Sequence, residues 1–366
     1  MSLMSIPFYD FTGIHPTSFK AKALARMAQI LEENSYVEGP YNQKFETEFA
    51  HMQGAKHALL VANGTDALEI SLRAFDVGVG DKVGLPGITF YATAEAILNV
   101  GAIPVHIDVD EKTGLMDPDS LERVSKDHQL KAIIPVHIYG LPAPMDAIEK
   151  ITKPLNIKII EDAAQAQGTY LPKGPAGSGD NLVTFSFYPT KNLAAFGDAG
   201  AILTSSDELA HKIKYLRNHG RGSDKLGRNS RCDHLQAAVL HLKLEDIEKQ
   251  NALRKKVAFK YHQQLKDVEL MPKEFLETSS WHLYPIVLAS IAEREKLQAY
   301  LKEQGIPSAP FYERAMSQEP ELTKYEGETK VAEGLAGRVI CLPLFPYLKD
   351  EQVDFVCKAI NERTSL

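Results

Sequence analysis

The stretch Thr184-Phe-Ser-Phe-Tyr-Pro-Thr-Lys191-Asn192 and the upstream run Ile157-Lys-Ile-Ile-Glu-Asp162 decide the fold of this chain. Residues 157–162 form a short, β-branched apolar run, which predicts a buried strand that ends at a carboxylate. Residues 182–187 predict a second strand, which stops before a Tyr-Pro pair and places Lys191 on an exposed loop. Ligands of α/β proteins bind at strand ends. We therefore expect Asp162 and Lys191 to face one crevice.

A buried acid and a lysine at strand ends are what pyridoxal 5'-phosphate (PLP) chemistry requires. The lysine amine forms the Schiff base, and the acid keeps the pyridine nitrogen protonated so that the ring accepts electrons. Lys191 and Asp162 are the catalytic candidates. Ser186, five residues before Lys191, can offer its hydroxyl to the cofactor phosphate, and Gln165 can reach the ring hydroxyl. Taken singly, a solvated lysine and a helix-capping aspartate are the ordinary explanations, and the combination favours the cofactor.

Two other segments follow predicted strands. Val61-Ala-Asn-Gly64-Thr65-Asp66 leads into a helix, whose first amides and the Thr65 hydroxyl can bind a phosphate. Phe90 follows the next strand, where its ring can lie flat on a pyridine. In isolation, helix capping explains the first segment and core packing the second.

The motifs Glu-Asp162-Ala-Ala-Gln165-Ala-Gln-Gly168 and Ser186-Phe-Tyr-Pro-Thr-Lys191-Asn192 resemble the signature pair of the PLP-dependent sugar aminotransferases of the DegT family. The resemblance covers nearly the whole chain and implies fold type I, that of the aspartate aminotransferase superfamily. It also implies that Gly64 and Thr65 belong to the phosphate-binding turn and that Phe90 stacks on the cofactor.

A basic, glycine-rich segment precedes the predicted long helix. Gly227-Arg-Asn229-Ser-Arg231 resembles the family element in which an asparagine reaches the cofactor phosphate of the partner subunit. The resemblance therefore implies a homodimer in which Asn229 has this role. Arginines of the segment can also meet a nucleotide diphosphate, and a solvated charged loop is the simpler explanation.

The order of predicted elements indicates an α/β fold. Strand-like runs alternate with helical segments as far as residue 204, which predicts a mostly parallel central sheet with helices on both faces. One long helix from Leu235 to about residue 265 is expected to link two domains. We predict a large PLP-binding domain over residues 1–245 and a smaller C-terminal α+β domain over residues 246–366.

Composition narrows the class of protein. The 366 residues carry a formal net charge of −7, which argues against general nucleic-acid binding. Three cysteines without CxxC spacing suggest a reducing compartment, so we expect a cytoplasmic protein without a disulfide framework or a metal site. No apolar run is long enough to span a bilayer. Met1–Leu3 are expected to be a leader ahead of a native start at Met4.

The resemblance implies transfer of an amino group from an amino acid, expected to be glutamate, to a keto group of a nucleotide-linked sugar, with Lys191 as the general acid and base. The turn Asn63-Gly64-Thr65-Asp66-Ala67-Leu68 is more similar to enzymes acting at carbon 3, so Asp66 favours a 3-keto sugar. A 4-keto sugar is the alternative. The simpler explanation of Asp66 is that an acidic residue in the first turn of a helix interacts favourably with the helix dipole. A sugar dehydratase-like enzyme, disfavoured by Lys191, and a non-catalytic regulatory homologue are the other hypotheses.

Overall fold

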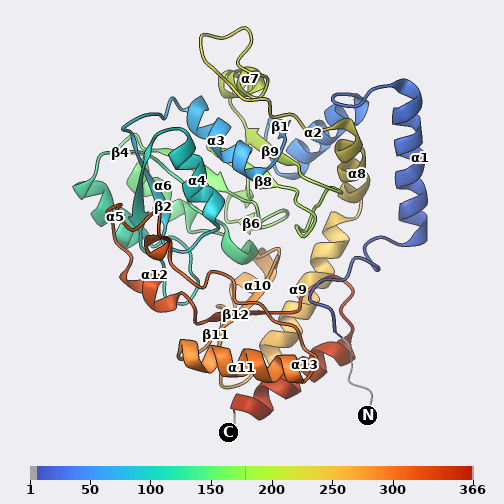
Figure 1. Cartoon of the computed structure of the whole chain (residues 1–366), viewed down its shortest axis with the longest axis vertical. Coiled ribbons are helices and arrows are strands. Elements are labelled where there is room, and N and C mark those ends of the chain that lie inside the picture. Colours follow the sequence, from blue (N-terminus) through green and yellow to red (C-terminus); the bar gives the residue numbers. More distant parts are fainter. Residues whose placement is uncertain (1–5, 178, 365–366) are drawn as a thin grey trace.

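A seven-stranded sheet forms the centre of the computed structural model, which describes residues 6–177 and 179–364 (Figure 1). The strands follow the order β1-β9-β8-β5-β4-β2-β3. Their bounds are β1 His57–Val61, β2 Lys82–Pro86, β3 Ile103–Ile107, β4 Leu130–Ile133, β5 Lys158–Asp162, β8 Leu182–Ser186 and β9 Gly200–Thr204. Pairing is parallel from β8 to β3, whereas β9 is antiparallel to both of its neighbours. The predicted α/β class with a mostly parallel sheet is confirmed.

Helices cover both faces of this sheet, and β1 shows how its residues divide between them. Leu59 and Val61 belong to the core on the side of α3, α4 and α7, whereas Ala58 and Leu60 belong to the core on the side of α2 and α8. Alternate residues of a strand point to opposite faces, so a strand covered on both sides must be apolar throughout. The helices of this part are α1 Thr17–Glu33, α2 Pro40–Met52, α3 Gly64–Ala74, α4 Tyr91–Asn99, α5 Pro118–Asp127, α6 Met145–Thr152, α7 Asp207–Leu216 and α8 His234–Leu244.

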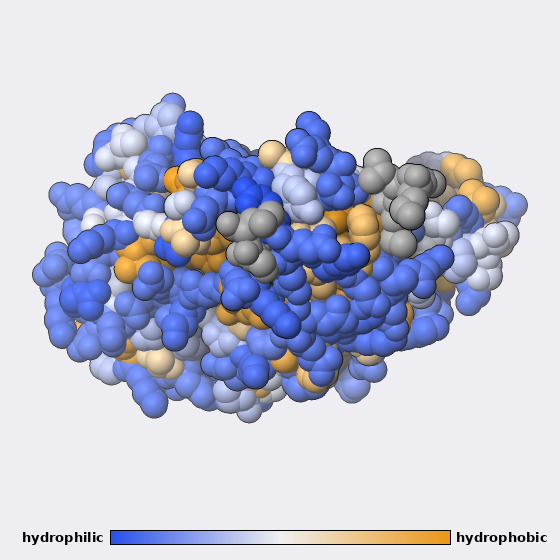
Figure 2. Space-filling model, turned by 90° about the horizontal axis from the view of Figure 1, so that it is seen from below, coloured by the Kyte–Doolittle hydropathy of each residue, from blue (hydrophilic) through white to orange (hydrophobic). Residues whose placement is uncertain are grey.

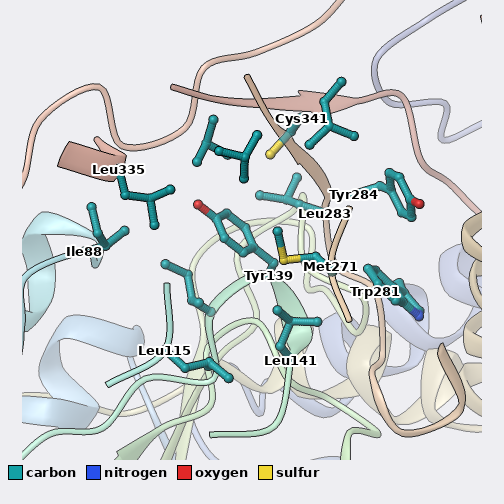
Figure 3. Packing of buried hydrophobic residues seen from close by; sticks show 14 of the residues in the cluster. Ile88, Leu115, Tyr139, Leu141, Met271, Trp281, Leu283, Tyr284, Leu335 and Cys341 are labelled. Atoms are coloured by element: carbon teal, nitrogen blue, oxygen red, sulfur yellow. The ribbon is translucent and has the colours of Figure 1, made fainter. Parts of the chain in front are cut away.

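The C-terminal part packs helices against a small antiparallel sheet of order β10-β11-β12. Its elements are α9 Ile247–Gln264, β10 Glu269–Leu270, α10 Phe275–Thr278, β11 Tyr284–Val287, α11 Ile291–Glu303, η2 Met316–Gln318, α12 Lys330–Leu335, β12 Val339–Leu342 and α13 Asp350–Thr364. One apolar core joins this part to the first: Tyr139 and Leu141 pack with Leu283 and Cys341 (Figure 3). The division into domains at residues 245 and 246 stays a prediction.

The single long helix expected from Leu235 to about residue 265 is wrong, because the chain breaks between α8 and α9. Asp246 caps α9 with φ −111° and ψ 0°. Its side chain accepts no capping hydrogen bond, so the break lies in the backbone, and aspartate has a lower helix propensity than the residues around it.

The apolar run over residues 131–138 suggests one long strand, but only its first part forms one. β4 ends at Ile133, two residues before Pro135, which has no N–H to donate to a neighbouring strand. A short 3-10 turn, η1 Ile138–Gly140, follows and buries Tyr139 in the apolar core that includes Leu283. The remaining short strands, β6 Tyr170–Leu171 and β7 Gly174–Pro175, form a separate hairpin.

The outer surface is mostly polar on the end formed by the C-terminal helices, with small apolar patches between hydrophilic residues (Figure 2). Among residues 6–177 and 179–364, no helix combines the length and apolar character needed to cross a membrane. Cys232, Cys341 and Cys357 are free and buried. The expected leader Met1–Leu3 lies outside the described residues.

Candidate active site

A cavity of about 730 Å³ opens at the carboxyl ends of β1, β2, β5 and β8. Because these strands run in the same direction, the loops that leave them meet at one edge of the sheet. Seven of the eight residues predicted to serve the cofactor line the cavity, namely Gly64, Thr65, Phe90, Asp162, Gln165, Ser186 and Lys191. The eighth, Asn229, does not line it.

Lys191 lies on a turn after β8, where its N–H donates to the carbonyl of Tyr188 at 2.8 Å. The predicted exposure is wrong, because Lys191 is half-buried and lines the cavity. Burial lowers the pKa of Lys191 to about 8, against the opposing charge of Asp162. The amine can therefore exchange a proton near neutral pH, which a general acid and base requires.

Asp162 ends β5 and is held in place by two donors. Its Oδ1 accepts from the N–H of Ala164 at 3.1 Å, and its Oδ2 accepts from the hydroxyl of Thr93 at 3.2 Å. Burial raises the pKa of this carboxyl, and the Ala164 N–H, Lys191 and Thr93 lower it in turn. Such a fixed, buried carboxyl favours a protonated nitrogen placed against it.

The start of α3 approaches the end of β8 so closely that Gly64 is required. A Cβ at residue 64 would lie 2.8 Å from Cβ of Ser186, shorter than side chains allow. Asn63 caps the helix by accepting from the N–H of Asp66 at 2.8 Å, and its carbonyl accepts from Ala67. Among the described residues, the N–H groups of Gly64 and Thr65 are left without an acceptor. Together with the nearby hydroxyl of Ser186, they are donors that an anion could bind at the N-terminus of α3.

Phe90 and Gln165 stand on different walls of the cavity. Phe90 caps α4 with 65% of its surface exposed, so one ring face is open to a ligand. Gln165 accepts from the N–H of Tyr139 at 2.6 Å and donates to the hydroxyl of Tyr312 at 2.7 Å. Its amide has two hydrogens, and the bond to Tyr312 uses one of them.

Asn229 is exposed on the segment between α7 and α8, which projects from the body (Figure 1). Its Oδ1 accepts from Arg231 at 3.0 Å. The preceding Arg228 does line the cavity, and it pairs with Asp66 at 3.3 Å and with Glu69. Asp66 therefore has a structural task, the orientation of Arg228, besides its place in the first turn of α3.

Among the residues to which sequence reasoning gave no role, Tyr9, His282 and Tyr312 line the cavity. Thr93 was also missed, and its hydroxyl donates to Asp162. Thr93 lies three residues after Phe90, on the same helical face, and this spacing is a signal that can be read locally. Tyr9 is hydrogen-bonded to Thr190 beside the lysine, and Tyr312 holds Gln165. They come from the first and last parts of the chain, so only the tertiary structure brings them to the site.

The DegT/DnrJ/EryC1/StrS aminotransferase family model matches residues 17–361 of this sequence. The chain belongs to this family. Its aminotransferases are PLP-dependent enzymes of fold type I, and this chain is one of them. The predicted family, fold type and cofactor are thereby confirmed.

Two relatives and one solved structure show the range of the similarity. A Pseudomonas aeruginosa protein, named UDP-2-acetamido-2-deoxy-3-oxo-D-glucuronate aminotransferase, is 38% identical over 97% of this chain and 99% of its own. A pleiotropic regulatory protein of Geobacillus stearothermophilus is 37% identical over 98% of both chains. The crystal structure of DesV from S. venezuelae, in complex with a ketimine intermediate, has a TM-score of 0.92 at 32% identity and covers 99% of both chains.

The residues present fit PLP. The open amides of Gly64 and Thr65 suit its phosphate, since they lack acceptors among the described residues. At Gly64, the approach of Ser186 leaves no room for a side chain. Asp162 suits the pyridine nitrogen because it is a buried carboxyl, and Lys191 is an amine of lowered pKa in the same wall. The assignment of each residue to its contact is a proposal.

Proposed function

We propose that this protein transfers an amino group from an amino acid to the keto group at carbon 3 of a nucleotide-linked sugar. We expect the amino acid to be glutamate. The observation that carries the proposal is the convergence of Lys191, Asp162 and the open α3 amides on one cavity. The complete set also argues against a purely regulatory role for this chain, although the Geobacillus relative is named a regulatory protein.

Carbon 3 is favoured by two independent considerations. The turn around Asp66 resembles that of enzymes acting at this carbon, and the Pseudomonas relative is named for a 3-oxo sugar. The ion pair between Asp66 and Arg228 weakens the first consideration, since it explains the acid without reference to the sugar. A 4-keto sugar stays the alternative.

Lys191 is assigned the proton transfer. When bound, PLP carries the amino group between the two substrates and withdraws electrons from the carbon that loses a proton. With a pKa of about 8, the amine of Lys191 is ready both to take a proton from that carbon and to return it. Its anchoring turn at Tyr188 holds the side chain in the cavity.

Asp162 is assigned the ring nitrogen, and the walls hold the rest of the cofactor. Thr93 and Ala164 keep the carboxylate in one orientation. We assign the phosphate to Gly64, Thr65 and Ser186, the ring face to Phe90 and the ring hydroxyl to Gln165.

The assembly is proposed to be a homodimer in the cytoplasm. Asn229 is exposed and lies outside the cavity of its own chain, which supports a role at the phosphate of a partner subunit. We also propose that the chain divides into a cofactor-binding domain, residues 1–245, and a C-terminal domain, residues 246–366.

The reverse half-reaction tests the function, because 3-keto sugars are labile. PLP-loaded protein is mixed with 3-amino or 4-amino nucleotide sugars, and conversion to pyridoxamine phosphate is followed by absorbance. We expect conversion with 3-amino sugars. Conversion with 4-amino sugars alone would move the reaction to carbon 4, and conversion with neither would remove the proposed substrate class.

A further inference from the structure

His282 precedes β11 and lines the cavity, although only 4% of its surface is exposed. Its Nδ1 lies 3.3 Å from Oδ1 of Asn192, the residue after the proposed catalytic lysine. A neutral imidazole carries its hydrogen on one nitrogen only, and the partner of Nδ1 decides which.

Two oxygen acceptors fix the orientation of the Asn192 amide. Its Nδ2 donates to the backbone carbonyl of Ser280 at 2.8 Å and to Oδ1 of Asn251 at 3.0 Å. The amide of Asn251 is fixed in turn, because its Nδ2 donates to the carbonyl of Gln167 at 2.8 Å. Asn192 therefore turns its oxygen to His282, and Nδ1 of His282 must carry the hydrogen.

The imidazole is also neutral. Burial lowers the pKa of His282 well below its ordinary value, and the positive charges of Lys191 and Arg254 lower it further. With its hydrogen on Nδ1, a neutral ring has only a lone pair at Nε2. No donor among residues 6–177 and 179–364 is hydrogen-bonded to this nitrogen. His282 thus offers one unused acceptor in the wall of the cavity.

We infer that His282 determines substrate specificity: its Nε2 accepts a hydrogen bond from a sugar hydroxyl on a carbon next to the keto carbon. The inference rests on the proposed function. Lys191 serves the reacting carbon, and His282 lines the same cavity close enough for the charge of Lys191 to act on its ring, so we place the group bound to Nε2 on a neighbouring carbon. Among the groups near that carbon, a hydroxyl has a hydrogen to donate, whereas a keto oxygen and a carboxylate have none.

The same geometry excludes a second assignment for this histidine. A carboxylate of the amino donor would place its negative charge against a lone pair, without the positive charge or N–H that such a group requires. The carboxylate of the donor must therefore bind elsewhere in the cavity. His282 therefore contacts the sugar substrate and not the amino donor.

A pair of nucleotide-linked amino sugars tests the inference. They carry the amino group on the same carbon and differ in one hydroxyl on the adjacent carbon, and both are offered to the PLP-loaded protein. For wild type, we expect kcat/KM to be about 10- to 100-fold higher with the hydroxyl present, since its absence leaves a buried acceptor unpaired. Equal values for the two sugars would overturn the inference while the proposed function stands. Conversion of neither would overturn both.

Two variants at the same position sharpen the test. His282→Phe should reduce the preference for the hydroxylated sugar to about twofold or less, because a phenyl ring accepts no hydrogen bond of this strength. His282→Gln, whose amide oxygen can take the place of Nε2, should restore part of the preference. The control is His211→Phe, on the exposed face of α7, which should keep the wild-type preference. An equal loss of activity with both sugars in His282→Phe would contradict a role in reading the hydroxyl.

The tautomer is tested without any substrate or cofactor. In ¹⁵N-labelled protein, long-range proton–nitrogen correlations identify which imidazole nitrogen carries hydrogen. We expect the Nδ1–H form for His282, and a mixture of both forms in Asn192→Ala, which removes the partner of Nδ1. An Nε2–H or doubly protonated ring in wild type at neutral pH would overturn the inference.

Discussion

Two regions of the site differ in how much of it one chain supplies. We call Asp162 and Lys191, at the strand ends, the floor of the cavity, and the exposed segment around Asn229 its rim. On the floor, Asp162 ends a buried strand and Lys191 follows the next strand of the sheet, and groups of the same chain hold both. On the rim, Asn229 stands exposed on the segment between α7 and α8, with Arg231, two residues away, as its partner.

This difference separates the residues that carry out the reaction from those that act between subunits. The floor has its acid, its amine and its anchoring hydrogen bonds within one subunit, so its effects should not depend on oligomeric state. The amide of Asn229 is exposed and does not line its own cavity, so we expect it to act on the site of another subunit. Changes on the floor should therefore reduce the rate, and changes on the rim should reduce cofactor binding.

The largest effect is expected from Lys191→Ala. The variant should fold, because the side chain belongs to a cavity wall and not to one of the apolar cores. Its rate of amino transfer should fall by roughly 10³-fold or more, since the amine is both the covalent anchor and the proton carrier. Single-turnover absorbance of protein reconstituted with cofactor measures this. A rate within tenfold of wild type would mean that another group moves the proton.

Asp162→Asn is expected to reduce the rate by about 10²-fold while cofactor stays bound, because a neutral amide cannot keep the pyridine nitrogen protonated. The matched control is Thr93→Val, which removes one hydrogen bond to the carboxylate and retains its charge. It should slow the reaction by less than the loss of the charge does. If both variants are equally slow, orientation and not charge is what Asp162 contributes.

The floor is also the part of the site that the sequence could predict. Strand-end residues such as Asp162 and Ser186 can be predicted from the local sequence, since a short apolar run identifies both the strand and its last residue. Tyr312 and His282 lie on loops of the C-terminal part and reach the cavity only through packing across the whole core. No periodicity marks them, and their local contexts are typical of core residues.

The fold shows the same division. Every strand of the central sheet was predictable from short apolar runs, whereas the break at Asp246 was not, because helical periodicity continues on both sides of it. The expected exposure of Lys191 was wrong for a related reason. Residues distant in sequence, Tyr9 among them, cover the loop that carries it.

On the rim, Asn229→Ala should weaken cofactor binding by about tenfold with little change in the rate at saturating cofactor, since it removes one hydrogen bond to a charged phosphate. Mixed dimers sharpen the comparison. When Asn229→Ala and Lys191→Ala subunits are combined, each mixed dimer should contain one site with both residues intact. Its binding of cofactor should return to the wild-type affinity. If no such tight, active site forms on mixing, Asn229 does not act across the interface.

The smallest effect is expected from Gly64→Ala, at the start of α3. A methyl group there would lie 2.8 Å from Cβ of Ser186, so the start of α3 must move away from β8. We expect an overpacking loss of about 1–2 kcal/mol in the free energy of unfolding. Cofactor affinity should fall by about fivefold, because the open amides move with the helix. Gly334→Ala on α12 is the matched control, since a Cβ there meets nothing within 4 Å. That change should be neutral, or stabilise the protein by up to about 1 kcal/mol, since alanine has a higher helix propensity than glycine.

Urea unfolding measures the stability of both variants, and cofactor titration measures their affinity. If Gly64→Ala loses stability and keeps full affinity, the phosphate is not held by the first amides of α3.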